Sequence, residues 1–173
     1  VRFDALESQE ITGILKNTNF EKGLFLEITP SLTTAAGVKY NQSQAWHFAE
    51  SVLVTGYELS DRTKLIDTSF EKFKTIYGNY PKSVGAWWID AGTLQYLHDK
   101  YGVIANLDVA DQYSTDQYQV WGQYYSSPFY PSKTNALFPG AASDKKIGVV
   151  TMQWATRDPY NAFGNGVGDS TYS

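Results

Sequence analysis

With 173 residues, of which 42% are hydrophobic, the chain can build the core of one domain but hardly of two. A formal net charge of -4 gives no basic surface, so neither nucleic acid nor an anionic membrane is an expected partner, and no apolar run is long enough to span a membrane. Because cysteine is absent, disulfides and thiolate metal sites are excluded, and the sequence indicates no compartment.

The amino terminus is predicted to hold a short strand followed by a helix. Val1–Ala5 can pair as a strand, which leaves the carboxylate of Asp4 at the end of that strand. Ser8 precedes apolar residues at helical spacing, so it is expected to cap an amphipathic helix.

The next apolar run carries a carboxylate inside it. Leu24–Pro30 is apolar except for Glu27 and the terminal Thr-Pro, and Pro30 is expected to end this strand. A buried carboxylate is costly unless it is paired or hydrogen-bonded, so Glu27 is either a functional acid or one half of an ion pair with Lys or Arg. Residues 31–50 then have the composition of a loop, and His47 in it is a candidate substrate contact.

The clearest helical pattern follows a third apolar run. Ser60 is predicted to cap this helix, Asp61 lies in its first turn, and Gly78 ends it. Apolar side chains recur at three- and four-residue steps and predict its inward face: Ile66, Phe70, Phe73 and Tyr77.

Beyond this helix, strands and helices alternate as in a parallel β/α fold. Val84–Asp90 is predicted to be a buried strand, Thr93–Tyr101 a helix ended by Gly102, and Val103–Val109 the next strand. Ligands bind at the carboxyl ends of such strands. Asp90 therefore has a functional position if the fold prediction is correct.

The last third of the chain is less regular. Between Asp111 and Gly140 prolines are mixed with aromatic residues, which indicates a long ordered loop, and a final strand is expected at Ile147–Trp154. We expect a single β/α-barrel-like domain over residues 1–163 and a flexible tail, rich in Gly and Ser, over residues 164–173.

Several of these features occur together in one known family. They are a Leu-Ser helix start, a helix ending in Gly, a short Pro turn and a strand rich in site residues: Leu59-Ser60, Gly78-Asn79-Tyr80-Pro81 and the strand to Asp90. In this order they resemble the polysaccharide deacetylase-like (NodB-homology) glycoside hydrolase/deacetylase barrels, and the resemblance covers about half of the chain. It implies an α/β fold with mainly parallel strands. Because closed barrels of this kind usually need more than ~200 residues, we expect an incomplete or distorted barrel, a fragment of a larger one.

The metal chemistry of that family is not expected here. Val52–Gly56 occupies the place of the family's zinc-binding His motif, and Phe3–Ala5 offers one Asp where the family has two. Ala86-Trp87-Trp88 likewise replaces an Arg-x-Pro strand. Zinc needs about three converging ligands such as His or Asp, and the chain has only two His in total. The sequence therefore predicts no metal site and no cofactor.

The predicted catalytic residues are carboxylates near strand ends: Glu27, Asp90 and Asp108. Glycoside hydrolysis needs two carboxyl groups roughly 5 to 9.5 Å apart, one of them with a raised pKa. For Asp90 the alternative is a helix cap. Asp108 could face either side of its strand.

The predicted substrate contacts are aromatic and polar residues, mostly in loops: His47, Trp88, Asp111, Trp121, Tyr124, Tyr125 and Arg157. Aromatic side chains offer flat faces for the C–H surfaces of sugars, but they also fill ordinary cores. The alternatives are packing roles for His47 and the aromatic residues, and an ion pair for Arg157.

These features predict a carbohydrate-active domain that acts on a glycan by metal-independent carboxylate acid/base chemistry, as a glycoside hydrolase does. The alternative is a non-catalytic glycan-binding or structural relative of the deacetylase barrel. An incomplete barrel would also expose an apolar face and an edge, which invites self-association or pairing with the missing remainder of the barrel. An extracellular or cell-surface location would suit such a domain.

Overall fold

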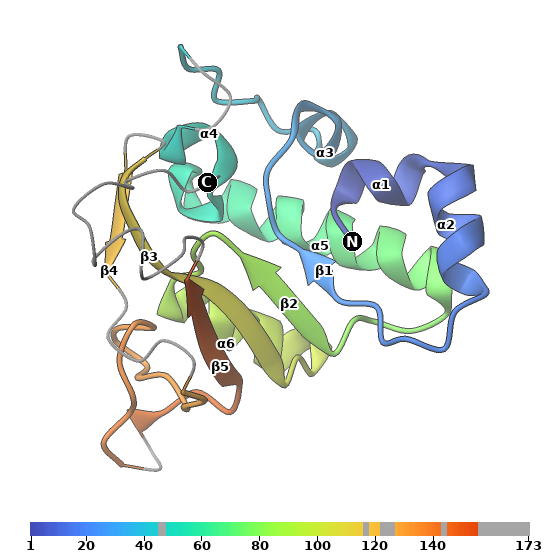
Figure 1. Cartoon of the computed structure of the whole chain (residues 1–173). Coiled ribbons are helices and arrows are strands. Elements are labelled where there is room, and N and C mark those ends of the chain that lie inside the picture. Colours follow the sequence, from blue (N-terminus) through green and yellow to red (C-terminus); the bar gives the residue numbers. More distant parts are fainter. Residues whose placement is uncertain (45–47, 116–117, 122–126, 143–144, 156–173) are drawn as a thin grey trace, which may run out of the picture.

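The structure is a computed structural model that describes residues 1–44, 48–115, 118–121, 127–142 and 145–155, with the backbone alone for residues 109–115, 118–121 and 154–155. Its elements follow in chain order (Figure 1): α1 Phe3–Glu7, α2 Gln9–Lys16, β1 Leu24–Phe25, α3 Pro30–Ala36, α4 Ala49–Val52, the 3-10 helix η1 Val54–Gly56, α5 Leu59–Tyr77, β2 Ser83–Ala86, α6 Ala91–Tyr101, β3 Ala105–Thr115, β4 Tyr118–Trp121 and β5 Val150–Ala155.

The strands form one mainly parallel sheet. β1 pairs with β2, β2 with β3 and β3 with β5, all in parallel, while β4 pairs antiparallel with the end of β3. In the described part of the chain no pairing joins β1 to β5, so the sheet is open. The α/β fold with mainly parallel strands is therefore confirmed, as an incomplete barrel.

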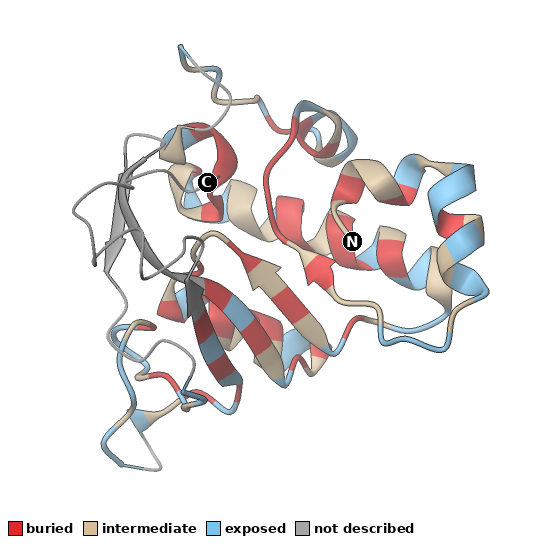
Figure 2. Ribbon diagram, viewed as in Figure 1, coloured by how far each residue is buried: buried red, intermediate tan, exposed pale blue. Residues whose placement is uncertain are grey.

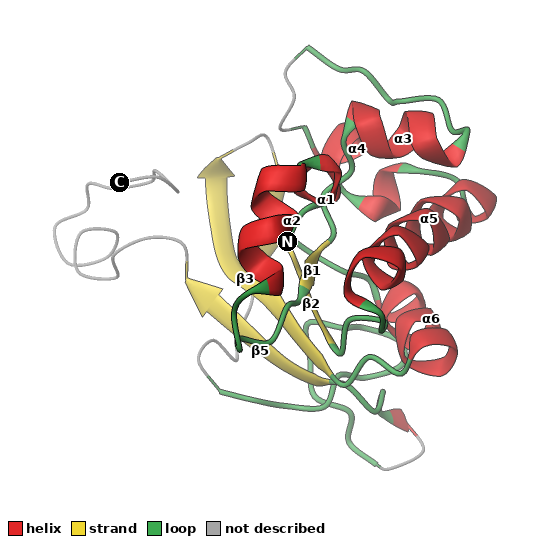
Figure 3. Ribbon diagram, turned by 90° about the vertical axis from the view of Figure 1, so that its right-hand side faces the viewer, coloured by secondary structure: helices red, strands yellow, loops and turns green. Residues whose placement is uncertain are grey.

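The two faces of the sheet differ in how they are covered. The register places Val84 and Ala86 on the face that packs into the core with α5 and α6, and Figures 2 and 3 show these helices on one side of the sheet. The other face carries a row across the strands: Phe25, Gly85, Leu107 and Met152. Leu107 and Met152 are each 40% exposed. Parallel sheets are normally covered on both faces, so this row resembles the inner face of a barrel that has been opened.

The long helix α5 is anchored to α6 by polar side chains as well as by apolar packing. Asp67 of α5 accepts hydrogen bonds from Tyr96 Oη at 2.7 Å and from the hydroxyl of Tyr101, and its Oδ2 lies 2.7 Å from Lys100 Nζ. The rings of Phe70 and Tyr101 are stacked at 4.2 Å. α5 begins at Leu59, one residue before the predicted cap, and it ends at Gly78 as predicted, where a φ of 86° favours glycine.

The amino-terminal prediction was wrong in part. Only Arg2 pairs as a strand would, through a parallel bridge to Phe25, because helix α1 begins at Phe3. Ser8 caps α2 as predicted, with its side chain accepting from the amide of Ile11. The strand predicted at Leu24–Pro30 is limited to Leu24–Phe25, and Pro30 is the first residue of helix α3.

The later elements also differ in length from the prediction. β2 ends at Ala86, four residues before the predicted end, and Asp90 caps helix α6 instead of lying at the end of the strand. β3 continues to Thr115 and is followed by β4, where a loop was expected. Within the described residues, no helix is both long and apolar enough to cross a membrane.

Candidate functional site

A pocket of about 570 Å³ lies at the carboxyl end of β1, where the fold is expected to place ligands. We call it the β1 pocket. It is lined by polar and charged side chains over a small apolar floor: Arg2, Asp4, Glu27, Ile28, Thr29, Pro30, Ser31, Tyr40 and Val52. Of the predicted catalytic residues, Glu27 lines this pocket.

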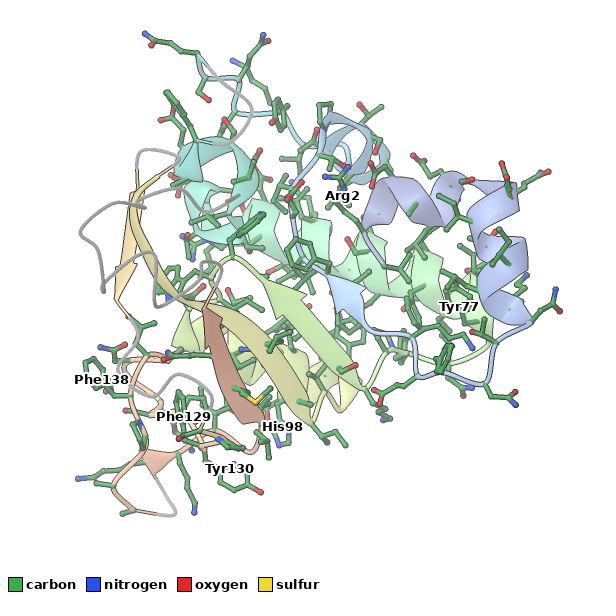
Figure 4. All side chains as sticks on the ribbon, in the orientation of Figure 1. Arg2, Tyr77, His98, Phe129, Tyr130 and Phe138 are labelled. Carbon is green, nitrogen blue, oxygen red and sulfur yellow. The ribbon has the colours of Figure 1, made fainter. Side chains whose placement is uncertain are left out.

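The amino terminus builds one wall of the β1 pocket. The amide of Phe25 donates to Val1 O at 2.8 Å, and the parallel bridge between Arg2 and Phe25 holds the first residues beside β1. The chain then turns into α1, which places Asp4 in the first turn of that helix. In Figure 4 the side chain of Arg2 lies between α1 and α3. The amino-terminal residues and the end of β1 thus bring three charged side chains into one pocket: Arg2, Asp4 and Glu27.

The guanidinium of Arg2 joins the two carboxylates of the pocket. Its Nε lies 2.7 Å from Asp4 Oδ1 and its Nη2 lies 2.5 Å from Asp4 Oδ2, a bidentate pair. Its Nη1 donates to Glu27 Oε1. The side chain of Glu27 is 5% exposed, whereas those of Arg2 and Asp4 are each 40% exposed. The ion pair that the sequence offered as an alternative for Glu27 therefore exists.

Trp87 holds the second oxygen of Glu27. Its indole Nε1 donates to Glu27 Oε2 at 2.8 Å, and its ring contacts the ring of Phe25 edge-on with centroids 5.9 Å apart. Both oxygens of Glu27 thus accept from fixed donors, and each keeps a lone pair for a ligand hydroxyl.

The pocket contains groups with opposite hydrogen-bonding roles. The hydrogen bond from Arg2 lowers the pKa of Asp4, so this carboxylate is ionised and accepts hydrogen bonds at neutral pH. Burial raises the pKa of Tyr40, so its phenol stays protonated and can donate. Thr29 and Ser31 add hydroxyl groups to the lining.

Asp90 lies in a different pocket, of about 310 Å³, between α5 and α6. Its carboxylate caps α6, accepting from Thr93 N at 3.0 Å and from Thr93 Oγ1 at 2.5 Å. Arg62 Nη1 lies 3.6 Å from Asp90 Oδ2. The helix-cap alternative for Asp90 is therefore present in the structure, and a catalytic role for it stays a prediction.

Asp108 is buried on the helix-facing side of β3. It lies in register with Ala86 of β2 and Gln153 of β5. Asn106 Nδ2 donates to Asp108 Oδ2 at 2.9 Å, and Asp108 Oδ1 is buried without a hydrogen-bond partner. Burial raises the pKa of Asp108 to about 7. Asp108 lines neither the β1 pocket nor the Asp90 pocket.

The predicted catalytic carboxylates are therefore not gathered in one pocket. Of the predicted substrate contacts, Trp88 is partly buried and its Nε1 has no hydrogen-bond partner. Asp111 and Trp121 pair across β3 and β4, and their side chains are not described. The remaining predictions, His47, Tyr124, Tyr125 and Arg157, lie outside the described residues.

Sequence reasoning did not select Arg2, Tyr40 or Asp4 as site residues. The sequence feature that pointed to this site was the carboxylate of Glu27 within an apolar run, because a buried carboxylate needs a partner. It could not identify Arg2, because Arg2 reaches Glu27 only once the first residues pair beside β1.

The residues around the β1 pocket can be compared with the zinc ligands of the deacetylase barrels. In the part of the chain that the structure describes, no three or more His, Asp or Glu side chains are grouped so that they could hold a metal ion. The carboxylates of the β1 pocket are joined through Arg2, whose positive charge opposes a cation between them. These residues do not fit a resident metal at this position.

Comparison with known proteins supports the fold. No curated protein matches the chain. It is similar to a crystal structure from Parabacteroides distasonis that bears the provisional name glycoside hydrolase/deacetylase, with a TM-score of 0.62 and 20% sequence identity. The match covers 91% of this chain and 33% of that chain, so this chain spans about a third of the length of the matched structure. Residues 40–173 match the family described as a domain of unknown function with a solved structure, DUF3863. Because this match includes most of the sequence, the chain belongs to the DUF3863 family.

Proposed function

We propose that this domain is carbohydrate-active and binds a glycan in the β1 pocket. The observation that carries the proposal is the pair of carboxylates, Asp4 and Glu27, held on one guanidinium at the carboxyl end of β1. Sugar hydroxyls need acceptors and donors in fixed positions, and carboxylates with Arg, Tyr and hydroxyl groups supply both. The name of the matched structure supports a carbohydrate-related role.

The pocket has the size and the chemistry of a sugar site. Its volume of about 570 Å³ lies within the roughly 300 to 1,000 Å³ range of small-molecule sites. The ring of Tyr40 offers a face on which a sugar can stack, and its protonated phenol can donate to a ring or hydroxyl oxygen. The formal charge of Arg2, Asp4 and Glu27 together is negative, which disfavours acidic sugars and is compatible with neutral ones.

Isothermal titration calorimetry with a panel of neutral oligosaccharides tests this proposal. Glu27→Gln keeps the size of the side chain but removes its charge, and Asp4→Asn does the same at the other carboxylate. Each is expected to weaken binding at least about tenfold, which corresponds to the loss of one charge-assisted hydrogen bond. Asp90→Asn is the matched control, because Asp90 lies in another pocket and Asn can still cap α6. Binding that is unaffected in both pocket variants would refute the proposal.

Hydrolysis of the bound glycan is the second candidate function, favoured by the presence of two carboxyl groups in one pocket. A hydrolase needs one ionised carboxylate and one carboxyl group with a raised pKa. The lowered pKa of Asp4 suits the first role. Turnover of a bound oligosaccharide that Glu27→Gln and Asp4→Asn both abolish would support hydrolysis, and a parent protein that binds but never cleaves would support binding alone.

We also propose that the uncovered sheet face associates with further protein. Leu107 and Met152 are exposed in a row that spans the parallel strands, on the face away from α5 and α6. Light scattering of the purified chain tests self-association: a Leu107→Lys variant should shift a dimer to monomer. A parent chain that is monomeric at the highest soluble concentration would contradict self-association.

A further inference from the structure

The pocket that contains Asp90 is not used by the functions proposed above. This Asp90 pocket lies where the first turns of α5 meet the start of α6, and Figure 3 shows the two helices side by side. Its volume of about 310 Å³ is at the small end of the roughly 300 to 1,000 Å³ range of ligand sites, so it suits a small molecule. The lining residues that decide its chemistry are Leu59, Arg62, Ile66, Asp90, Thr93 and Tyr96.

Arg62 is held so that one end of its guanidinium is available to a ligand. Its Nε donates to the carbonyl of Tyr57 at 2.6 Å and its Nη2 donates to the carbonyl of Thr55 at 3.0 Å, which fixes the plane of the group. Its Nη1 lies 3.6 Å from Asp90 Oδ2, which is longer than a hydrogen bond. Among the described residues Nη1 has no hydrogen-bond acceptor, so both of its N–H groups can donate to a molecule in the pocket.

The carboxylate of Asp90 is also fixed but not saturated. Its Oδ1 accepts from Thr93 N at 3.0 Å, and its Oδ2 accepts from Thr93 Oγ1 at 2.5 Å. A carboxylate has about four acceptor positions, so Asp90 can accept further hydrogen bonds while it caps α6. The side chains of Asp90 and Arg62 are each 24% exposed. Two fixed groups of opposite charge are therefore within reach of one ligand.

Apolar and aromatic side chains surround this pair of charges. Ile66 is buried, whereas Leu59 is 75% exposed and so leaves apolar surface uncovered beside the pocket. Tyr96 Oη donates to Asp67 Oδ1 at 2.7 Å, which fixes the ring of Tyr96 in the pocket wall. Arg62 and Asp90 are the charged residues of the lining. The Asp90 pocket thus presents one cation, one anion and an apolar wall.

We propose that the Asp90 pocket binds a free α-amino acid with an aliphatic side chain. The ligand carboxylate accepts from Nη1 of Arg62, its ammonium group donates to Asp90, and its side chain packs on Leu59 and Ile66. Both charges of an α-amino acid are attached to one carbon atom, so they are close together, as those of Arg62 and Asp90 are. A ligand with a carboxylate alone is repelled by Asp90, and one with an amine alone is repelled by Arg62, so the zwitterion fits best.

Isothermal titration calorimetry with L-leucine as the probe tests the proposal on the unaltered protein. 4-Methylpentanoate is leucine without its ammonium group, and leucinamide is leucine without its negative charge. Each is expected to bind at least about tenfold more weakly than leucine, which corresponds to the loss of one charge-assisted contact. No binding of leucine at millimolar concentration, or equal affinity for leucine and either analogue, would overturn the proposal.

A charge variant locates leucine in the Asp90 pocket. Asp90→Asn retains a cap for α6 but removes the charge that faces the ammonium group, and it should weaken leucine binding at least about tenfold. Asp61→Asn is the matched control: it makes the same substitution in the first turn of α5, at a residue outside the pocket lining, and should bind like the parent. Leucine binding that is unchanged in Asp90→Asn, or equally weakened in Asp61→Asn, would exclude this pocket.

A substitution in the apolar wall tests the class of amino acid. Leu59→Ser changes an exposed side chain, so the fold should be kept, while the ratio of the affinities for leucine and alanine should fall at least about threefold. An unchanged ratio would show that the ligand side chain does not pack on Leu59. Glu27→Gln should leave leucine binding unchanged, which keeps this result distinct from any failure of the β1 pocket proposal.

Discussion

The indole Nε1 of Trp87 donates a 2.8 Å hydrogen bond to the carboxylate of Glu27, a residue 60 positions earlier in the chain. Trp87 follows the last residue of β2, and Glu27 follows the end of β1, so the contact joins the carboxyl ends of two adjacent parallel strands. With Arg2 on its other oxygen, Glu27 is fixed in one orientation at the base of the β1 pocket. Fixed acceptors of this kind are what a binding site needs.

Removal of the Trp87 hydrogen bond should destabilise the domain. Trp87→Phe keeps much of the ring contact with Phe25 but leaves Glu27 Oε2 without its donor, and we expect a loss of about 1 to 3 kcal/mol in the free energy of unfolding. Trp88→Phe is the matched control, because it removes the same atoms from an indole whose Nε1 has no partner. Urea denaturation measures both. Equal losses in the two variants would show that the hydrogen bond contributes nothing.

The pairing of Arg2 with Asp4 should appear in the pH dependence of stability. Because the pKa of Asp4 is lowered in the folded state, the pair stabilises the protein above the unfolded pKa of about 3.9, and this contribution is lost as pH falls through the lower folded pKa. Arg2→Gln should lower the free energy of unfolding by about 1 to 3 kcal/mol at pH 7. This is less than the loss expected when a fully buried ion pair is broken, since the side chain of Arg2 is partly exposed.

Urea denaturation of the parent and of Arg2→Gln at pH 7, 5 and 3 measures this dependence. The difference in stability between the two proteins should narrow below about pH 4, where Asp4 becomes protonated in the unfolded chain. A constant difference over this range would contradict the assigned ion pair.

Asp108 should have the opposite pH dependence. Its folded pKa is raised to about 7 by burial, so the folded state holds a proton that the unfolded state has lost between about pH 4 and pH 7. The stability of the parent should therefore fall as pH rises through this window. The side chain of Asp108→Asn cannot ionise. The free energy of unfolding of this variant, relative to that of the parent, should therefore rise by about 1 kcal/mol or more between pH 5 and pH 8.

Thermal or urea denaturation of both proteins at these two pH values measures that difference. Asp99→Asn is a suitable control, because it makes the same substitution at an exposed position of α6. A difference in stability between Asp108→Asn and the parent that does not change with pH would contradict a buried, protonated carboxyl group at this position.

Asp90 should matter for stability but not for glycan binding. Asp90→Ala removes the cap of α6 and is expected to cost about 0.5 to 2 kcal/mol, while Asp90→Ser retains a cap and most of that stability. Neither variant should change affinity for an oligosaccharide, because Asp90 lines another pocket. Calorimetric titration checks this point, and a folded Asp90→Ser that no longer binds would place Asp90 in the site.

The parts of the fold that could be predicted from the sequence are those set by local patterns. The periodic apolar residues of α5 and the glycines at positions 78 and 102 determined two helices and their ends, and the alternation with strands indicated a parallel sheet. The segments that were wrongly assigned lack such patterns. Phe3–Glu7 is too short to show helical periodicity, and Pro30 is compatible with both the end of a strand and the start of a helix.

The candidate site was only partly predictable for a different reason. The sequence identified Glu27 as a carboxylate in need of a partner, and it named the helix cap as the alternative for Asp90. It could not reveal that Asp4 and Arg2 meet Glu27, because this contact depends on the pairing of the first residues with β1. Distance between side chains on separate segments is a tertiary property, which neither spacing nor composition encodes.

The central claim, glycan binding in the β1 pocket, is tested most directly by a crystal structure of the domain soaked with a neutral oligosaccharide that calorimetry shows to bind. We predict sugar density in contact with Glu27, Asp4 and Tyr40, with sugar hydroxyls donating to the two carboxylates. Density at another surface, with the β1 pocket filled by water alone, would contradict the account.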